Sequence, residues 1–319
     1  MKIGVLDILV DSPRTWINFA YRGVLKKQYA SIVPQAVAVW CRQLGHDVAY
    51  AAYYGQRDPK RLLPDDLDVV FLSTYTQSSA LAYALAKLYR REGTLTVIGG
   101  PHARSFPADC LRFFDWVVLE CDKTLIDEIL TGAFDRGSIV TSGRPLRDIP
   151  SVEERMPEIA VSAFANGRPV WSSMIPLLSS VGCPYSCDFC VDWSNDYALL
   201  PLDRLEADLT FISSRWPGVM VAYHDPNFRV KFDQILSVME RVPQPARVPY
   251  VMESSLSILK GPRLRRLKDT RCVYIAPGVE SWQAYSEKVG VGKSVGRDRL
   301  ESLVARFEDL RDHVVGLQA

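Results

Sequence analysis

The chain has 319 residues, of which 48% are hydrophobic and 24% are charged, and its formal net charge is +1 at pH 7. A chain of this length and apolar content can bury a core and is expected to form two domains. The near-neutral charge shows no nucleic-acid footprint, and the basic cluster at Arg263, Arg265, Arg266 and Lys268 is interpreted as the solvated face of one helix.

The first ten residues form a short apolar run that contains an acidic residue and lacks a small-residue cleavage site. This pattern favours a first strand over a signal peptide. No apolar run is long enough to span a bilayer. The cysteine count is seven, an odd number, and the scattered thiols are expected to be small buried side chains: Cys41, Cys110, Cys121 and Cys272. Together these features predict a cytoplasmic protein.

Residues 1–135 are expected to form the first domain, because strand-like and helix-like segments alternate along them. Strands that alternate with crossover helices predict an α/β fold with a doubly wound parallel sheet, Rossmann-like and in the flavodoxin-like strand order. The expected strands are 3–10, 48–54, 69–75, 95–98 and 116–119, and the expected helices are 31–44, 77–92, 105–114 and 122–131.

Two polar segments follow the third and fourth expected strands, where ligands of such sheets bind. Hydroxyl side chains in the segment 73–79 can bind an anion, or they can cap the helix that follows. Paired glycines at Gly99 and Gly100 let a flat or phosphate-bearing group approach the backbone, or they can serve the strand-to-helix turn alone. Both interpretations stay open for each segment.

Residues 136–171 are poor in periodicity and rich in turn formers, so they are expected to be a linker. The strand and helix rhythm resumes in the second domain, which is expected to span 172–319. Its expected strands are 175–180, 219–223, 248–252, 272–276 and a last run at 314–317, and its expected helices are 202–215, 231–240, 257–267, 282–288 and 297–310.

Three cysteines directly after the first strand of this domain have the spacing C-x3-C-x2-C: Cys183, Cys187 and Cys190. Three thiolates on one tight loop suit an iron–sulfur cluster, and a 4Fe-4S cube held by three ligands keeps one iron free for substrate. A structural zinc site is an alternative, but zinc needs four closed ligands and no further Cys or His lies within thirty residues after Cys190.

The cysteine loop resembles the signature of the radical S-adenosylmethionine (SAM) superfamily, including the aromatic Phe189 just before the third cysteine. The resemblance implies that the three cysteines hold the cluster and that SAM chelates the fourth iron. An electron from the reduced cluster then cleaves SAM to a 5′-deoxyadenosyl radical. In such enzymes the cofactor carries the difficult chemistry, and the protein orients it and excludes water.

The first domain resembles the cobalamin-binding domain that precedes the radical SAM core in one branch of the superfamily. None of the four histidines fits the D-x-H-x-x-G motif of domains that bind the metal through histidine. Cobalamin therefore stays a possible cofactor rather than a required one, and the domain could also serve as a docking scaffold. By the resemblance the cobalamin-lining positions are Thr74, Thr76, Gln77, Ser78, Gly99 and Gly100.

Polar residues just past the second, third and fourth strands of the second domain are candidates for binding SAM: Asp225, Asn227, Glu253 and Glu280. Active sites of strand–helix barrels collect at the carboxyl ends of the strands, and acidic residues suit a cationic sulfonium ligand. The alternatives are an Asx turn for Asp225 and Asn227, and a helix cap or an ion pair for either glutamate.

A complete radical SAM core resembles a partial barrel of six strand–helix units, and only four units and one strand are expected here. We therefore expect a fragment of a longer protein with a truncated (β/α) barrel. The resemblance implies an enzyme that uses a 4Fe-4S cluster and SAM, with cobalamin, for methyl transfer or radical rearrangement on an unactivated carbon. It also implies a small-molecule, lipid or peptide substrate and a reducing partner such as flavodoxin or ferredoxin.

Two rivals remain at this point. A radical SAM methylthiotransferase acting on RNA or protein has the same domain order, but it carries three further cysteines in its first domain, one of them early in the chain. The first domain here has Cys41, Cys110 and Cys121 without that early cysteine. The second rival is a zinc- or cobalamin-binding regulatory module without catalytic activity.

Overall fold

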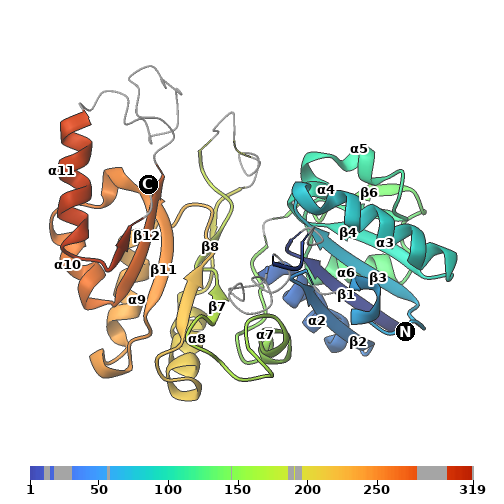
Figure 1. The fold of residues 1–319 in the computed structure, drawn as a ribbon, viewed down its shortest axis with the longest axis horizontal. Helices are drawn as coiled ribbons and strands as arrows, with labels where there is room; N and C mark the ends of the chain where they lie inside the picture. The colour runs from blue at the N-terminus through green and yellow to red at the C-terminus, as the bar shows by residue number, and fades with distance from the viewer. Residues whose placement is uncertain are drawn as a thin grey trace. The chain divides into compact units, whose positions relative to one another are not determined.

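The computed structural model describes residues 1–10, 15–17, 31–55, 58–144, 146–185, 190, 196–278 and 300–317. The chain divides into two compact units, a first unit from Met1 to Ser173 and a second unit from Met174 to Ala319 (Figure 1). Each unit is built around its own parallel sheet. No helix of the described residues is long and apolar enough to cross a membrane.

The first unit contains a six-stranded parallel sheet in the order β2-β1-β3-β4-β5-β6. Its first five strands have the flavodoxin-like order that the sequence predicts. The structure has a sixth strand that the sequence did not predict. This strand has three residues, which are too few to show a hydrophobic periodicity. The strands are β1 (Lys2–Ile8), β2 (Asp47–Tyr53), β3 (Val69–Thr74), β4 (Leu95–Gly99), β5 (Trp116–Val118) and β6 (Ser138–Val140).

Helices cover both faces of this sheet (Figure 1). The strand β1 is apolar on both of its faces, so both must be covered. Ile3 and Val5 belong to one apolar core and Leu6 and Ile8 to another, because successive strand residues point to opposite faces. One face packs against α2 (Ile32–Gln43) and α6 (Lys123–Leu130), and the other against α3 (Ser79–Arg91), α4 (Pro101–Ser105) and α5 (Pro107–Cys110).

The prediction of one helix over 105–114 is wrong, because the structure has the two short helices α4 and α5 there. Pro107 lacks an N–H and cannot continue a helix from α4, but it fits the first position of α5. The helix expected over 257–267 also begins later, because Gly261 has φ of +59° and Pro262 starts α10 (Pro262–Asp269). Short 3-10 turns complete the fold: η1 (Pro59–Leu62), η2 (Thr76–Ser78), η3 (Gln244–Ala246) and η4 (Leu256–Ile258).

The segment 136–171 contributes β6 and the helix α7 (Met156–Ser162) to the first unit. Arg155, just before this helix, is fully buried and donates from Nη1 to Gln35 Oε1 of α2 at 2.7 Å. Gln35 Nε2 in turn donates to Ser162 Oγ at 3.2 Å. These buried polar contacts hold α7 against α2, because a buried donor left without a partner costs free energy.

The second unit contains a five-stranded parallel sheet in the order β13-β12-β11-β10-β7, so that neighbours in sequence are neighbours in space. This is the strand–helix succession predicted for a partial barrel. The strands are β7 (Met174–Leu177), β10 (Met220–Tyr223), β11 (Tyr250–Ser255), β12 (Cys272–Gly278) and β13 (Gly316–Leu317). The helices are α8 (Leu202–Arg215), α9 (Phe232–Arg241), α10 and α11 (Leu300–Arg311).

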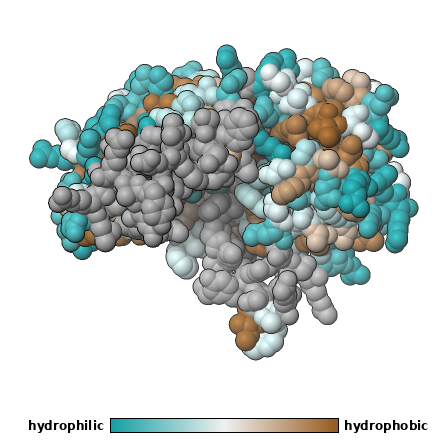
Figure 2. All heavy atoms as spheres, turned by 90° about the horizontal axis from the view of Figure 1, so that it is seen from above, coloured by the Kyte–Doolittle hydropathy of each residue, from teal (hydrophilic) through white to brown (hydrophobic). Residues whose placement is uncertain are grey.

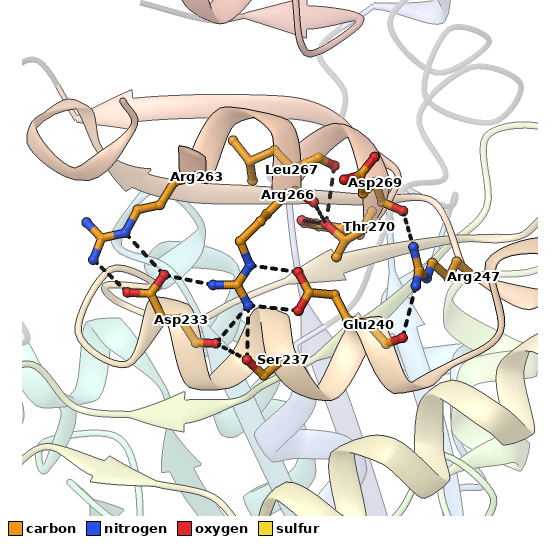
Figure 3. Close-up of polar contacts among 10 residues, drawn as sticks. Asp233, Ser237, Glu240, Arg247, Arg263, Arg266, Leu267, Asp269 and Thr270 are labelled. Carbon is orange, nitrogen blue, oxygen red and sulfur yellow. Dashed lines mark hydrogen bonds and ion pairs between the residues drawn. The ribbon is translucent and has the colours of Figure 1, made fainter. Parts of the chain in front are cut away.

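The basic cluster of α10 is not a uniformly solvated face (Figure 3). Arg266 donates from Nη1 to Asp233 Oδ1 at 2.9 Å and from Nε to Glu240 Oε1 at 2.6 Å, both on α9. Arg263 Nη2 lies 2.6 Å from Asp233 Oδ2. Arg265 and Lys268 are exposed. The predicted solvated face is therefore confirmed for two of the four residues, while the other two join α10 to α9.

Candidate functional site

The loop that carries the cysteine motif begins at a short antiparallel pair of strands. β8 (Ser180–Val181) pairs with β9 (Ala198–Leu199), which brings the two ends of the intervening segment together. Cys183 and Cys190 lie within this segment and are half-buried. Cys187 and Phe189 lie outside the described residues. The structure thus fixes the base of the cysteine loop, and it leaves two soft sulfur ligands accessible on it.

Asp225 anchors the chain just before this loop. Its carboxylate accepts hydrogen bonds from the backbone N of Ser179 at 3.1 and 3.0 Å and from Ser180 Oγ at 2.6 Å. The side chain is 3% exposed, and burial raises the pKa of Asp225 while the serine hydrogen bonds oppose the shift. Asp225 therefore ties the carboxyl end of β10 to Ser179 and to Ser180 at the start of β8.

Asn227 lies two residues further on and contacts the first cysteine. Its Nδ2 donates to Cys183 Sγ at 3.8 Å, and its Oδ1 accepts from the backbone N of Arg229 at 3.3 Å. The second contact is the Asx-type turn that the sequence left open. The first places an N–H donor on a sulfur, and such hydrogen bonds tune the reduction potential of iron–sulfur clusters. One side chain thus serves both the turn and the motif.

Arg229 joins the cysteine loop to the next strand. Its guanidinium lies 4.6 Å from the centroid of the Tyr185 ring and donates to the Tyr185 hydroxyl. Its Nη1 donates to Ser255 Oγ, the last residue of β11, at 3.3 Å. A planar guanidinium can stack on a ring and hydrogen-bond at its edges at the same time, which an ammonium cannot do. No local sequence pattern indicates Arg229, since its partners are remote in sequence.

The two glutamates at the rim are placed differently. Glu253 is exposed on β11 and pairs in register with Ala276 of β12. Glu280 lies outside the described residues. Within the part of the chain that the structure describes, no three His, Cys, Asp or Glu side chains are grouped so as to hold a metal ion. The three cysteines cannot be counted there, because Cys187 is not among the described residues.

The two glycines at the carboxyl end of β4 have different surroundings. Gly100 has φ of +89°, and a Cβ on it would meet Ser73 Oγ at 2.9 Å and the backbone N of Thr74 at 3.2 Å. The fold itself therefore requires glycine at position 100. A Cβ on Gly99 would meet nothing closer than Val118 O at 3.8 Å. The fold leaves room at position 99, which agrees with a ligand that approaches the backbone there.

The hydroxyl segment after β3 presents its side chains in two directions. Thr74 is buried and donates to the carbonyl of Tyr75 at 3.1 Å, while Thr76 and Gln77 are exposed. Ser78 is 1% exposed, and its Oγ has no hydrogen-bond partner among the described residues. Thr76, Gln77 and the orphaned hydroxyl of Ser78 thus fit a polar ligand, whereas Thr74 serves the backbone.

A chain of polar contacts missed by sequence analysis lies at the same edge. His102 Nε2 lies 2.7 Å from the Tyr83 hydroxyl, which donates to Asp109 Oδ2 at 2.7 Å. His102 Nδ1 lies 3.3 Å from Thr76 Oγ1. Burial lowers the pKa of His102. Its position after Gly99 and Gly100 was a visible signal, but Tyr83 and Asp109 gave none, because each looks like an ordinary helix residue.

Asp7 is a second residue that sequence analysis did not select. It lies near the carboxyl end of β1, is fully buried, and accepts from the backbone N of Ser31 at 2.9 Å and from Ser31 Oγ at 3.2 Å. Burial raises the pKa of Asp7 to about 7. An acidic residue inside an apolar strand was the available signal.

The scattered cysteines of the first unit do not form a second cluster site. Cys110 belongs to the core on one face of the sheet, whereas Cys41 and Cys121 belong to the core on the opposite face. Burial raises the pKa of Cys41 and of Cys121 to about 12. Thiols that lie on opposite faces of a sheet cannot ligate one cluster. This contradicts a methylthiotransferase that binds its second cluster through these three cysteines.

Two curated proteins are similar in sequence, and no family model matches the chain. Bacteriochlorophyllide d C-8(2)-methyltransferase of Chlorobaculum tepidum is 23% identical over 234 residues, which are 68% of this chain and 50% of that protein. Bacteriochlorophyllide d C-12(1)-methyltransferase of the same organism is 22% identical over 270 residues, 80% of this chain and 57% of that protein. The chain thus spans about half the length of these curated relatives.

Two solved structures share the fold. Both are of TsrM from Kitasatospora setae, a radical S-adenosylmethionine methyltransferase. One, with cobalamin and a 4Fe-4S cluster bound, superposes with a TM-score of 0.66 at 15% identity and covers 98% of this chain and 68% of that chain. The other, with tryptophan substrate and the SAM analogue aza-SAM bound, has a TM-score of 0.64 at 16% identity and covers 99% and 67%.

These likenesses agree with the features of the chain itself. The cysteine spacing lies after the first strand of the second sheet, and a flavodoxin-like sheet precedes it. The structural likeness extends over nearly the whole chain, through both units. The chain is thus similar in fold to a radical SAM methyltransferase solved with cobalamin and a 4Fe-4S cluster, and similar in sequence to two bacteriochlorophyllide d methyltransferases.

Proposed function

We propose that this chain is the cobalamin-binding and cluster-binding part of a radical SAM methyltransferase that acts on an unactivated carbon of a small molecule. The observation that carries the proposal is that each unit has polar groups suited to a cofactor at the carboxyl edge of its own sheet. The second unit presents the cysteine loop with Asn227 on Cys183, and the first unit presents Gly99 beside exposed hydroxyl and amide side chains. A radical rearrangement without methyl transfer is the alternative outcome at the same site.

In the second unit, Cys183, Cys187 and Cys190 would hold a 4Fe-4S cluster, which supplies the electron for cleavage of SAM when both are bound. The half-buried thiols and the N–H donor from Asn227 suit this ligand. Asp225 would act as a positioning residue, because its carboxylate is committed to Ser179 and Ser180. We keep Phe189, Asn227, Glu253 and Glu280 as the proposed SAM-facing residues.

In the first unit, the proposed cobalamin-facing residues are Thr76, Gln77, Ser78 and Gly99, with Thr74 and Gly100 shaping the backbone behind them. Bound cobalamin would supply a carrier for the methyl group. Hydrophobic side chains reach the surface of this unit in several places (Figure 2). Tyr75 and Phe106, 39% and 49% exposed, follow β3 and α4 directly and offer apolar contact area for a large flat ligand.

Features of the chain weigh against both rivals. The separation of Cys110 from Cys41 and Cys121 speaks against a second cluster, and hence against a methylthiotransferase. A zinc module needs a closed set of four ligands, which the cysteine loop does not provide by itself. The named substrates of the relatives are bacteriochlorophyllide d and tryptophan, which supports a small-molecule substrate here. A cytoplasmic location and a flavodoxin- or ferredoxin-type reductant complete the proposal.

The experiment is an anaerobic assay of SAM cleavage with the reconstituted chain and a chemical reductant. We expect 5′-deoxyadenosine to form with the wild-type chain and not with Cys183→Ala. Cys272→Ala is the matched control, since that thiol is buried in β12, and burial raises its pKa to about 12. A brown, iron-loaded wild-type protein that never cleaves SAM would contradict the proposal, as would bound zinc in place of iron.

A further inference from the structure

The polar chain at the carboxyl edge of the first sheet joins four elements. It runs from Asp109 on α5 to Tyr83 on α3, then to His102 on α4 and Thr76 in η2. His102 is 4% exposed, and Tyr83 is held by stacking on Phe113 with ring centroids 4.2 Å apart. Thr76, at one end, is exposed beside the proposed ligand edge, and Asp109, at the other end, is partly exposed.

The direction of each hydrogen bond in this chain follows from its two ends. Arg112 Nη1 donates to Asp109 Oδ1 at 3.0 Å, and the hydrogen bond from Tyr83 and the pairing with Arg112 lower the pKa of Asp109. Asp109 is thus a carboxylate and accepts only. The single proton of the Tyr83 hydroxyl goes to Asp109, and the tyrosine oxygen must accept from His102 Nε2.

The tautomer of His102 is then determined. A neutral imidazole has one donor and one acceptor nitrogen, so an Nε2–H that donates to Tyr83 leaves Nδ1 as an acceptor. Burial lowers the pKa of His102, which favours the neutral ring. Thr76 therefore donates its only hydroxyl proton to Nδ1, and the lone pairs of Thr76 Oγ1 are left to accept.

We propose that Asp109, Tyr83 and His102 fix the Thr76 hydroxyl as a hydrogen-bond acceptor, so that this edge recognises a ligand through an N–H or O–H group that the ligand donates. The inference deepens the proposed function, on which it rests for the identity of the ligand, because cobalamin carries amide groups that can donate in this way. Tyr83 and Asp109 are positioning residues in this account, since they act through His102.

The first test reads the tautomer without any ligand. Nitrogen NMR of histidine-labelled protein, with His102→Gln to assign the signal, is expected to show a neutral His102 protonated on Nε2. In Tyr83→Phe the acceptor for Nε2–H is lost, and we expect the signal to move toward a mixture of tautomers. A ring protonated on Nδ1 in the wild type, or an unchanged signal in Tyr83→Phe, would overturn the proposal.

The second test titrates the anaerobic chain with hydroxocobalamin and follows the absorbance. Thr76→Val keeps the shape but removes the acceptor, and we expect binding to weaken about tenfold, the effect of one hydrogen bond of ordinary strength. Thr76→Ser should bind like the wild type. Thr210→Val is the matched control, because Thr210 is an exposed threonine of α8 whose hydroxyl donates to its own helix.

The two tests separate the failure of this inference from the failure of the proposed function. Equal binding by the wild type and Thr76→Val would overturn the inference and leave cobalamin binding standing. Absence of binding to the wild type would contradict the cobalamin part of the proposed function. In that case the tautomer of His102 still supports or overturns the hydrogen-bond chain.

Discussion

Two neighbouring glycines show how single residues divide their roles between fold and ligand. Gly100 has positive φ and lies against Ser73 and the backbone of Thr74, whereas a Cβ on Gly99 would make only ordinary contacts with Val118, at 3.8 Å and beyond. Glycine at position 100 is explained by the turn. Glycine at position 99 has no such structural cause, and the proposed ligand is the reason that remains.

We predict opposite outcomes for alanine at these two positions. Gly100→Ala should lower the free energy of unfolding of the first unit by about 1–3 kcal/mol, because of its backbone conformation and its close neighbours. Gly99→Ala should change stability by less than about 0.5 kcal/mol. It should nevertheless weaken hydroxocobalamin binding several-fold, since a methyl group then occupies the approach. Urea unfolding and absorbance titration measure the two effects.

The pair also serves as its own control. A Gly99→Ala protein that unfolds at a lower urea concentration than the wild type would show that the turn, and not a ligand, requires this glycine. A Gly99→Ala protein that is stable and binds hydroxocobalamin as the wild type does would show that the ligand does not approach the backbone here.

Residue roles at the cysteine loop could be predicted only in part. The sequence places Asp225 and Asn227 at a strand end, and it identifies Cys183 and Cys190 from their spacing. The partners of Asp225 are 45 and 46 residues away in the chain, and no local pattern indicates them. Polar contacts of this kind depend on how strands align in the sheet, which becomes known only with the fold.

Among the elements, α9 and α10 are joined by a network of ion pairs and hydrogen bonds (Figure 3). Asp233, Ser237 and Glu240 lie along one face of α9, and Arg266 donates to all three side chains. Half-buried, multiply bonded guanidinium groups contribute more than isolated exposed ion pairs. This face couples the two crossover helices that cover one side of the second sheet.

We predict that Arg266→Lys lowers the free energy of unfolding of the second unit by about 1–2 kcal/mol, because an ammonium cannot replace the planar fork that reaches both carboxylates. Arg265→Lys is the matched control at a neighbouring, exposed position of the same helix and should have no effect. Chemical denaturation at low and high salt measures both. If Arg266→Lys has the same free energy of unfolding as the control, the contact between α9 and α10 does not stabilise the second unit through the shape of the guanidinium.

At the scale of elements, periodicity predicted most helices and strands because burial on one face imposes it. The helix α8, for instance, has the bounds expected for it, 202–215. The expectation was wrong where local chemistry interrupts a pattern, as Pro107 does between α4 and α5 and Gly261 does before α10. The sequence did not predict β6. This strand has three residues, and only Val140 is buried, so it shows no hydrophobic periodicity. The helix expected at 282–288 lies outside the described residues.

The whole molecule consists of two units that each present a carboxyl edge with its own polar groups. In the first unit this edge carries Thr76, His102 and Gly99, and in the second it carries Asn227 and the cysteine loop. The order of two parallel α/β units could be predicted from the alternation of elements alone. Function could not be assigned by fold, because such sheets serve many activities. The proposed function rests on the spacing of the three cysteines.

The central claim is that three thiolates hold a 4Fe-4S cluster and leave one iron for SAM. Mössbauer spectroscopy of anaerobically reconstituted, iron-labelled chain with and without SAM tests it most directly. We predict about four irons per chain, one of which changes its signal when SAM is added, and loss of the cluster in Cys183→Ala. A wild-type chain that retains no iron, or a cluster whose irons are all indifferent to SAM, would contradict the account.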